Sequence, residues 1–319
     1  MTTPKQTIPV VDLNDFKTDS EQDNQRFVNT VGKGLEDLGF FAVENHGIDY
    51  NLIAKAYKLC EDFFDLPEKE KLKYEIENGG GQRGFTSYGK EHAKGIDAPD
   101  LKEFWHVGRE FEDTNHSLYN VYPKNIWPVQ VPEFKAVMAE LYRQIDTCAA
   151  SLLKACALYL GAPEDLLSNM ALDGNSILRV IHYPPIPEDA NPSSIRAGAH
   201  EDINLITLLC ESTAEGLELL QRDGQWRPIH ALKGQIVADA GDMLQNVTNG
   251  IIKSTTHRVV NPNNDRSRRF SMPFFVHPRS EVDLSPLGTT VDLCGGEKRY
   301  PNITAGAYLK KRLEEIGLM

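Results

Sequence analysis

The feature that most constrains the fold is a change at about residue 173 from a sequence pattern typical of helices to one typical of strands. Beyond this point the chain carries short, β-rich runs that are separated by turns of Gly, Asp, Asn and Pro. Many short strands at such spacing are typical of a β-sandwich or barrel, and the jelly roll is a natural candidate. The runs cover residues 176–183, 205–210, 217–220, 235–238, 254–260 and 269–277.

The part before this change contains one long periodic stretch, residues 132–160. Its apolar residues recur on one side, as in an amphipathic helix, and it ends at Gly161-Ala162-Pro163. Glycine tolerates the left-handed cap conformation, and proline cannot continue a helix. We expect this helix to back a sheet. Shorter helices are predicted at 27–38, 52–63 and 305–316, and strands at 8–13 and 39–43.

Composition limits the partners of the chain. Its 34 basic residues are outnumbered by 46 acidic ones, and the net charge of −12 would repel phosphate backbones and anionic lipid. We therefore expect no nucleic-acid partner and no membrane partner. The five cysteines form no Cys-x-x-Cys pair, and no apolar run approaches the roughly 20 residues of a membrane span. These features predict a cytoplasmic protein. As an expectation separate from these features, the protein would be a monomer or a weak homo-oligomer.

A candidate metal site begins at His200 and Asp202. Two residues apart in an extended strand, their side chains project to the same side and can grip one ion. His257 is a candidate third ligand, and two histidines with one carboxylate on one face leave the other side of a metal open. The alternative is a histidine at a strand end beside an incidental carboxylate, since one such pair is expected by chance.

A second candidate site follows in the last predicted strand. Arg269 and Ser271 share one face there, so a guanidinium and a hydroxyl can clasp a carboxylate together. Tyr183 ends another strand and can donate a phenolic hydrogen bond. Taken singly, each residue could instead be an ordinary ion-pair partner or strand residue. A 2-oxo acid that chelates a redox iron at one end needs an anchor of this kind for its far carboxylate.

Residues 79–84 satisfy the dinucleotide pattern G-x-G-x-x-G. That motif works only when a strand delivers the glycines to the start of a helix, and here a charged helical segment precedes them. We interpret residues 79–90 as a flexible loop that borders the substrate. The candidate lining residues are Phe85, Tyr88, Phe104, Trp105 and His106.

Several motifs occur together and in order along the chain. They are 8–13, 39–48 and 63–67 in the first part, and His200-Glu201-Asp202, 241–245, 248–250, 253–259 and Arg269-Phe270-Ser271 in the second. In these motifs the chain resembles the isopenicillin N synthase-like family of non-haem iron oxygenases, most of which depend on 2-oxoglutarate. The resemblance implies a mixed α/β (α+β) fold. Its core would be a distorted double-stranded β-helix of the jelly-roll or cupin type, backed by helices, after a helix-rich N-terminal region.

The resemblance also implies an activity and two sets of site residues. The enzyme would use Fe(II), 2-oxoglutarate and O2, and would couple oxidative decarboxylation of 2-oxoglutarate to hydroxylation, desaturation or cyclisation of a small organic substrate. Fe(II) would be bound by His200, Asp202 and His257. The 2-oxoglutarate would be held by Arg269, Ser271 and Tyr183.

The implied organisation has four parts: 6–125 as the N-terminal dioxygenase region, 126–172 as backing helices, 173–280 as the Fe(II)/2-oxoglutarate catalytic core, and 281–319 as a C-terminal tail and helix. Ile181 and His182 depart from the family pattern, which has Asn and Tyr there, and Glu201 replaces a common Thr. Three alternatives stay open at this point: a 2-oxoglutarate-independent oxidase of the same family, a non-redox metal-binding cupin, and a binding protein with a decayed site. The motifs do not encode the primary substrate.

Overall fold

The computed structural model describes residues 8–16, 18–77, 79–91, 100–186, 195–210, 213–229, 234–261 and 267–315. Two β-sheets form its centre. The larger has, in spatial order, β1 (Val10–Asp12), β2 (Phe40–Glu44), β10 (Ile236–Ala240), β7 (Ile206–Cys210), β12 (Arg269–Val276), β5 (Ile177–Tyr183), β4 (Glu103–Gly108) and β3 (Gly84–Thr86). The smaller has β6 (Ala197–His200), β11 (His257–Val259), β8 (Leu217–Leu220) and β9 (Trp226–Pro228).

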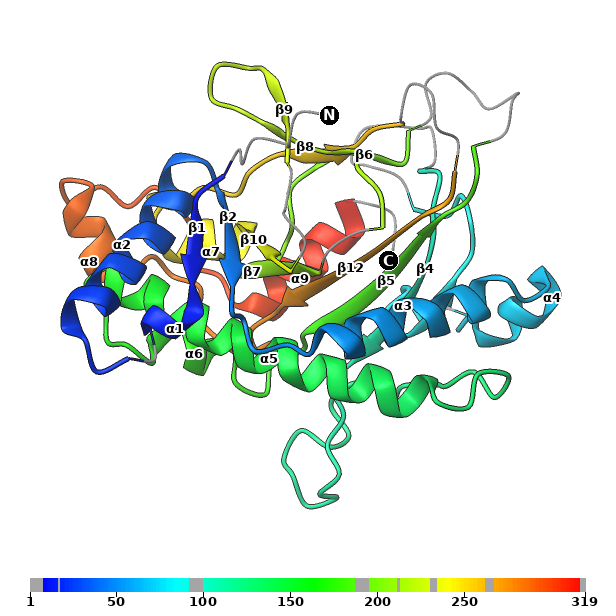
Figure 1. The fold of residues 1–319 in the computed structure, drawn as a ribbon. Coiled ribbons are helices and arrows are strands. Elements are labelled where there is room, and N and C mark those ends of the chain that lie inside the picture. Colours follow the sequence, from blue (N-terminus) through cyan, green and yellow to red (C-terminus); the bar gives the residue numbers. More distant parts are fainter. Residues whose placement is uncertain are drawn as a thin grey trace.

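The two sheets lie over one another, with the smaller above the larger in Figure 1. From β5 onward the chain crosses repeatedly between them, so β5, β7, β10 and β12 belong to one sheet while β6, β8, β9 and β11 belong to the other. This alternation confirms the double-stranded β-helix that we expected. It also makes β6 and β11, far apart in the sequence, direct neighbours.

The helix α5 (Phe134–Tyr159) runs beneath the larger sheet in Figure 1 and confirms the long helix predicted from periodicity. Leu141, Ile145 and Leu152 of its apolar stripe are fully buried, and each such side chain contributes about 1.5–3 kcal/mol by leaving water. Gly161 follows the helix with φ +67°, the left-handed conformation that ends it.

Other helices surround this core. The helices α2 (Glu21–Asp37) and α3 (Tyr50–Phe64) pack against α5 and confirm two further predictions, as does α9 (Ala305–Glu315) for a last helix. Short helices complete the chain: α1 (Leu13–Phe16), α4 (Glu68–Lys71), a 3-10 turn at Leu72–Tyr74, α6 (Leu166–Ala171), α7 (Asp242–Val247) and α8 (Gly288–Leu293). Across the described ranges, no helix combines the length and the apolar character that crossing a membrane requires.

The loop interpretation of residues 79–90 was wrong for Gly84–Thr86, which form β3 and pair with β4. The element that follows the glycines is the strand β3 and not a helix, so the dinucleotide pattern is a coincidence, as expected. Phe85 and Trp105 are core residues, because strand pairing turns both toward Phe63. The ring centroids of Phe85 and Trp105 lie 5.8 and 4.7 Å from that of Phe63.

Candidate functional site

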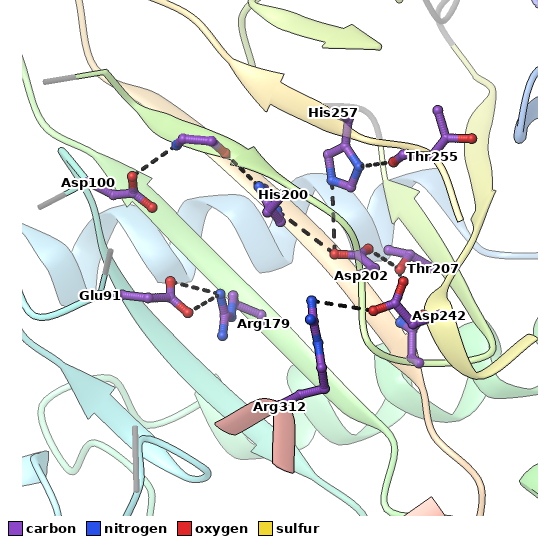
Figure 2. A network of polar contacts seen from close by, with 12 residues as sticks. Glu91, Asp100, Arg179, His200, Asp202, Thr207, Asp242, Thr255, His257 and Arg312 are labelled. Carbon is purple, nitrogen blue, oxygen red and sulfur yellow. Dashed lines mark hydrogen bonds and ion pairs between the residues drawn. The ribbon is translucent and has the colours of Figure 1, made fainter. Parts of the chain in front are cut away.

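The structure brings His200, Asp202 and His257 together at one end of the space between the sheets (Figure 2). Their potential ligand atoms all lie within 4.8 Å of one another. The Nε2 atoms of both histidines are 3.9 Å from Oδ1 of Asp202. His200 and His257 meet because they are direct partners in the ladder between β6 and β11. Strand β6 ends at His200, so Asp202 converges from the segment beyond the strand.

Both imidazoles are held in the orientation that a metal ligand needs. Nδ1 of His200 is 2.7 Å from the carbonyl oxygen of Gly198, and Nδ1 of His257 is 3.1 Å from that of Thr255. A proton on each Nδ1 donates to its carbonyl, which leaves the lone pair of Nε2 facing the centre of the site. Burial, together with the neighbouring His257, lowers the pKa of His200 to about 4 and keeps its imidazole neutral at physiological pH.

Asp202 is fixed by its own hydrogen bonds. The Thr207 hydroxyl donates to Oδ2 of Asp202 and accepts a 2.9 Å hydrogen bond from Nδ2 of Asn204. The backbone carbonyl of Asp202 accepts a 2.7 Å hydrogen bond from the amide of Asp242. Two imidazole nitrogens and one carboxylate oxygen on one face suit Fe(II) with open coordination positions. The donor set therefore fits the metal that the resemblance implies.

A cavity between the sheets joins these ligands to the second predicted site, because Arg269, Ser271 and Tyr183 all line it. Arg269 is buried, and its Nε donates a 3.0 Å hydrogen bond to the carbonyl of Ala214. Its NH1 has no hydrogen-bond partner among the residues that the structure describes. A buried guanidinium with an unsatisfied donor is costly unless an anion completes it, so the site fits the carboxylate of a 2-oxo acid.

Three further polar side chains line the same cavity and were missed: Lys102, Arg179 and Asp239. Lys102 and Asp239 lie in no motif that points to binding. Arg179 carried a usable signal, because it is two and four residues before Ile181 and Tyr183 on one face of β5. Burial, reinforced by the charge of Asp202, raises the pKa of Asp239.

The five side chains that we expected to border the substrate are not among the described residues that line this cavity, although Phe104 packs beside Ile181 and Tyr183. Within the described part of the chain, the lining of this cavity includes none of Phe85, Tyr88, Phe104, Trp105 and His106. Ile181 does line it, beside Ser271 in the ladder, as expected for the residue at that departure from the family pattern.

Two known protein families together match most of the chain. Residues 8–130 match the family described as non-haem dioxygenase in morphine synthesis N-terminal, and residues 174–278 match the 2OG-Fe(II) oxygenase superfamily. Among curated proteins, homoarginine-6-hydroxylase 2-ODD-C23.2 of Arabidopsis thaliana is 30% identical over 294 residues, which cover 89% of this chain and 80% of that protein.

Two solved structures are similar to this chain along nearly its whole length. A 2OG-Fe(II) oxygenase family protein from Caulobacter crescentus is 40% identical with a TM-score of 0.86, covering 98% of this chain and 99% of that chain. T7H of Neurospora crassa, in complex with alpha-KG, is 27% identical with a TM-score of 0.85, covering 98% of both chains. The oxygenase is thereby favoured over the non-redox cupin and the 2-oxoglutarate-independent oxidase. The chain belongs to the isopenicillin N synthase-like family of the 2OG-Fe(II) oxygenase superfamily and is an Fe(II)- and 2-oxoglutarate-dependent oxygenase.

Proposed function

We propose roles for six side chains of this oxygenase. The Fe(II) ligands are His200, Asp202 and His257, and the residues that hold 2-oxoglutarate are Arg269, Ser271 and Tyr183. The observation that carries the proposal is the common cavity: the clustered ligand atoms and the incompletely paired Arg269 line one space. The register Arg269↔Tyr183 and Ser271↔Ile181 supports it, since it turns the predicted anchor toward this space.

Iron and 2-oxoglutarate supply the oxidising power when they are bound. The residues of the chain position the reactants and exclude water. Thr207 holds the carboxylate of Asp202, while the carbonyls of Gly198 and Thr255 hold the two imidazoles. Apolar side chains such as Leu209 and Val259 complete the lining.

The reaction that we propose is hydroxylation of a small organic molecule, with 2-oxoglutarate converted to succinate and CO2. Relatives named as hydroxylases support this outcome over desaturation or ring closure. We also propose the four-part organisation 6–125, 126–172, 173–280 and 281–319, which is supported by the positions of the two family matches.

A direct test is to incubate the purified protein with Fe(II), 2-oxoglutarate, isotopically labelled O2 and an organic compound that stimulates succinate formation, and to measure succinate and label in the products. We expect succinate to carry one labelled oxygen atom and the organic product to carry the other. An organic product that has lost two hydrogens and gained no label would contradict hydroxylation. Succinate formation that does not need Fe(II) would contradict the iron site itself.

A further inference from the structure

A second charged cluster lies at the end of the cavity away from Arg269. On β5, Arg179 and Tyr183 line the cavity from the same face of the strand. The step of four positions between their Cα atoms corresponds to about 13 Å along a strand. Five carbons of 2-oxoglutarate span about 6 Å at most, since each C–C bond is about 1.5 Å. A co-substrate held at Arg269 and Tyr183 and chelated to the metal therefore leaves Arg179 for another molecule.

Arg179 is held at this end by contacts on three sides. Its Nε donates a 2.6 Å hydrogen bond to Nε2 of His106, and its NH1 donates to both carboxylate oxygens of Glu91 at 3.1 and 3.2 Å. Its guanidinium carbon lies 4.2 Å from the ring centroid of Phe104 and 5.2 Å from that of Phe275. The guanidinium is therefore anchored toward β4 and does not bend back to Arg269, which lies on β12.

Lys102 joins Arg179 through a shared partner. Its Nζ lies 2.7 Å from Glu91 and 2.8 Å from Asp100 (Figure 2 shows both carboxylates in the view of the iron ligands). Burial alone would raise the pKa of Glu91, but Arg179 and Lys102 lower it well below its usual range. Two cations and two carboxylates thus form a buried cluster without net charge.

Only the cationic half of this cluster faces the cavity. Lys102 and Arg179 line it, and Glu91 and Asp100 are not among its described lining residues. Within the described ranges, the hydrogen bonds of Arg179 use Nε and NH1 and leave NH2 free, and Lys102 keeps a third N–H beyond its two carboxylate contacts. A cationic group of a ligand would meet two like charges here, whereas a carboxylate would meet a planar fork and an ammonium.

We propose that Arg179 and Lys102 form the subsite that recognises a carboxylate of the primary substrate. The enzyme then acts on small carboxylic acids, and the carboxylate sits at the β4 side while a C–H bond lies near the metal. This inference rests on the roles proposed above for the iron ligands and for Arg269. It adds the chemical class of the substrate and the residues that select it.

Matched acids and amides provide the test. The probes are L-arginine and L-argininamide, L-phenylalanine and L-phenylalaninamide, and indole-3-acetic acid and indole-3-acetamide. Each is added to the Fe(II)- and 2-oxoglutarate-loaded enzyme, and succinate formation above the level without probe is measured. We expect at least one acid to stimulate turnover and its amide to fail. The proposal is overturned if the amides stimulate turnover as strongly as the acids do. It is also overturned if none of the acids stimulates turnover.

Variants then tie the selectivity to the residues. In Arg179→Gln we expect the KM of the stimulating acid to rise about 10- to 100-fold, because a charge-assisted pair is lost. Removing Arg179 leaves Lys102 facing both Glu91 and Asp100 in a buried cluster with excess negative charge. The double variant Arg179→Gln/Glu91→Gln is therefore made as well, because it removes one charge of each sign. A matched control is Arg109→Gln, since Arg109 is a part-buried arginine paired with Asp146 outside the cavity.

Calorimetric titration of 2-oxoglutarate separates this proposal from the one on which it rests. If Arg179 belongs to the substrate subsite, Arg179→Gln and the double variant should raise the KM of the acid far more than they raise the Kd of 2-oxoglutarate. If both variants instead weaken the binding of 2-oxoglutarate and leave the KM of the acid unchanged, the cluster serves the co-substrate and the proposal is wrong. If the wild-type protein fails to bind 2-oxoglutarate, the roles of Arg269, Ser271 and Tyr183 fail first.

Discussion

The guanidinium of Arg269 lies over the ring of Tyr183, with its Cζ 5.0 Å from the ring centroid, and the two residues are direct partners in the ladder between β12 and β5. Backbone register thus sets which side chains meet in the cavity. A slip of one residue in either strand would turn that strand's lining residues to the opposite face. The proposed anchor for the co-substrate is therefore positioned by the pairing of β12 with β5.

Replacing Arg269 tests this anchor. We expect Arg269→Gln to raise the KM for 2-oxoglutarate about 10- to 100-fold, because a charge-assisted contact to a carboxylate is worth about 1.5–3 kcal/mol. Arg269→Lys should restore part of the loss, since it keeps the charge but not the planar fork. The control is Arg268→Gln, whose native side chain pairs with Asp65 outside the cavity. Equal changes in both Gln variants would refute the assignment.

Thr207 is expected to act through Asp202. Thr207→Val keeps the shape of the side chain and removes the hydroxyl that donates to Oδ2 of Asp202. Loss of such a support lowers metal affinity about 10- to 100-fold in comparable sites. The apparent Kd for Fe(II), measured from the metal dependence of succinate formation and by calorimetry with Mn(II), should rise accordingly. Thr147→Val, which removes a hydroxyl from the exposed side of α5, should leave it unchanged.

Local patterns in the sequence were sufficient to propose the metal ligands and the carboxylate anchor. Arg269 and Ser271 share one face of β12, and Asp202 follows His200, the last residue of β6, by two positions. The class of fold followed from the spacing of short strands after one long helix. Even the bounds of α5 could be predicted closely, because Gly161 ends it by a local mechanism.

The substrate side of the cavity could not be predicted in the same way. Glu91, Lys102 and Arg179 meet only because β4 pairs with β5, a contact between segments about 80 residues apart. Aromatic residues beside a glycine-rich turn resemble a binding loop, yet pairing of β3 with β4 places Phe85 and Trp105 in the core. Long-range pairing decided these positions, and no local pattern reports it.

Burial of His106 predicts a pH dependence of stability. Its Nδ1 lies 2.5 Å from the carbonyl of Gly81, and its Nε2 accepts a hydrogen bond from Arg179. Burial, and then the charge of Arg179, hold the pKa of His106 well below its usual range. The unfolded chain takes up a proton below about pH 6.5 and the folded chain does not, so this contribution is present above that pH and is lost as pH falls.

Urea unfolding of the wild type and of His106→Gln at about pH 7.5 and about pH 5.5 measures this effect. The wild type should lose up to about tenfold in its folding constant per pH unit more than the variant. The surface control His116→Gln should follow the wild type. Parallel pH profiles for all three proteins would show that His106 does not titrate as its contacts imply.

The apolar stripe of α5 predicts that shortening one of its buried side chains strongly lowers the free energy of unfolding. Leu152 is fully buried against the sheet, so Leu152→Ala should lower the free energy of unfolding by about 2–5 kcal/mol through lost transfer energy and a residual cavity. Lys135→Ala, on the exposed side of the same helix, should change it by less than about 0.5 kcal/mol. Urea denaturation checks both, and a Leu152→Ala loss below about 1 kcal/mol would mean that the helix does not back the sheet as described.

The central claim is that the cluster of His200, Asp202 and His257 holds the iron on which turnover depends. Its most direct test is Fe(II)-dependent succinate formation by Asp202→Ala, compared with wild type and with Asp146→Ala, whose carboxylate pairs with Arg109 outside the cavity. We expect the rate of Asp202→Ala to fall by at least about a hundredfold and that of Asp146→Ala to remain near wild type. An unchanged rate in Asp202→Ala would contradict the assignment of the metal site.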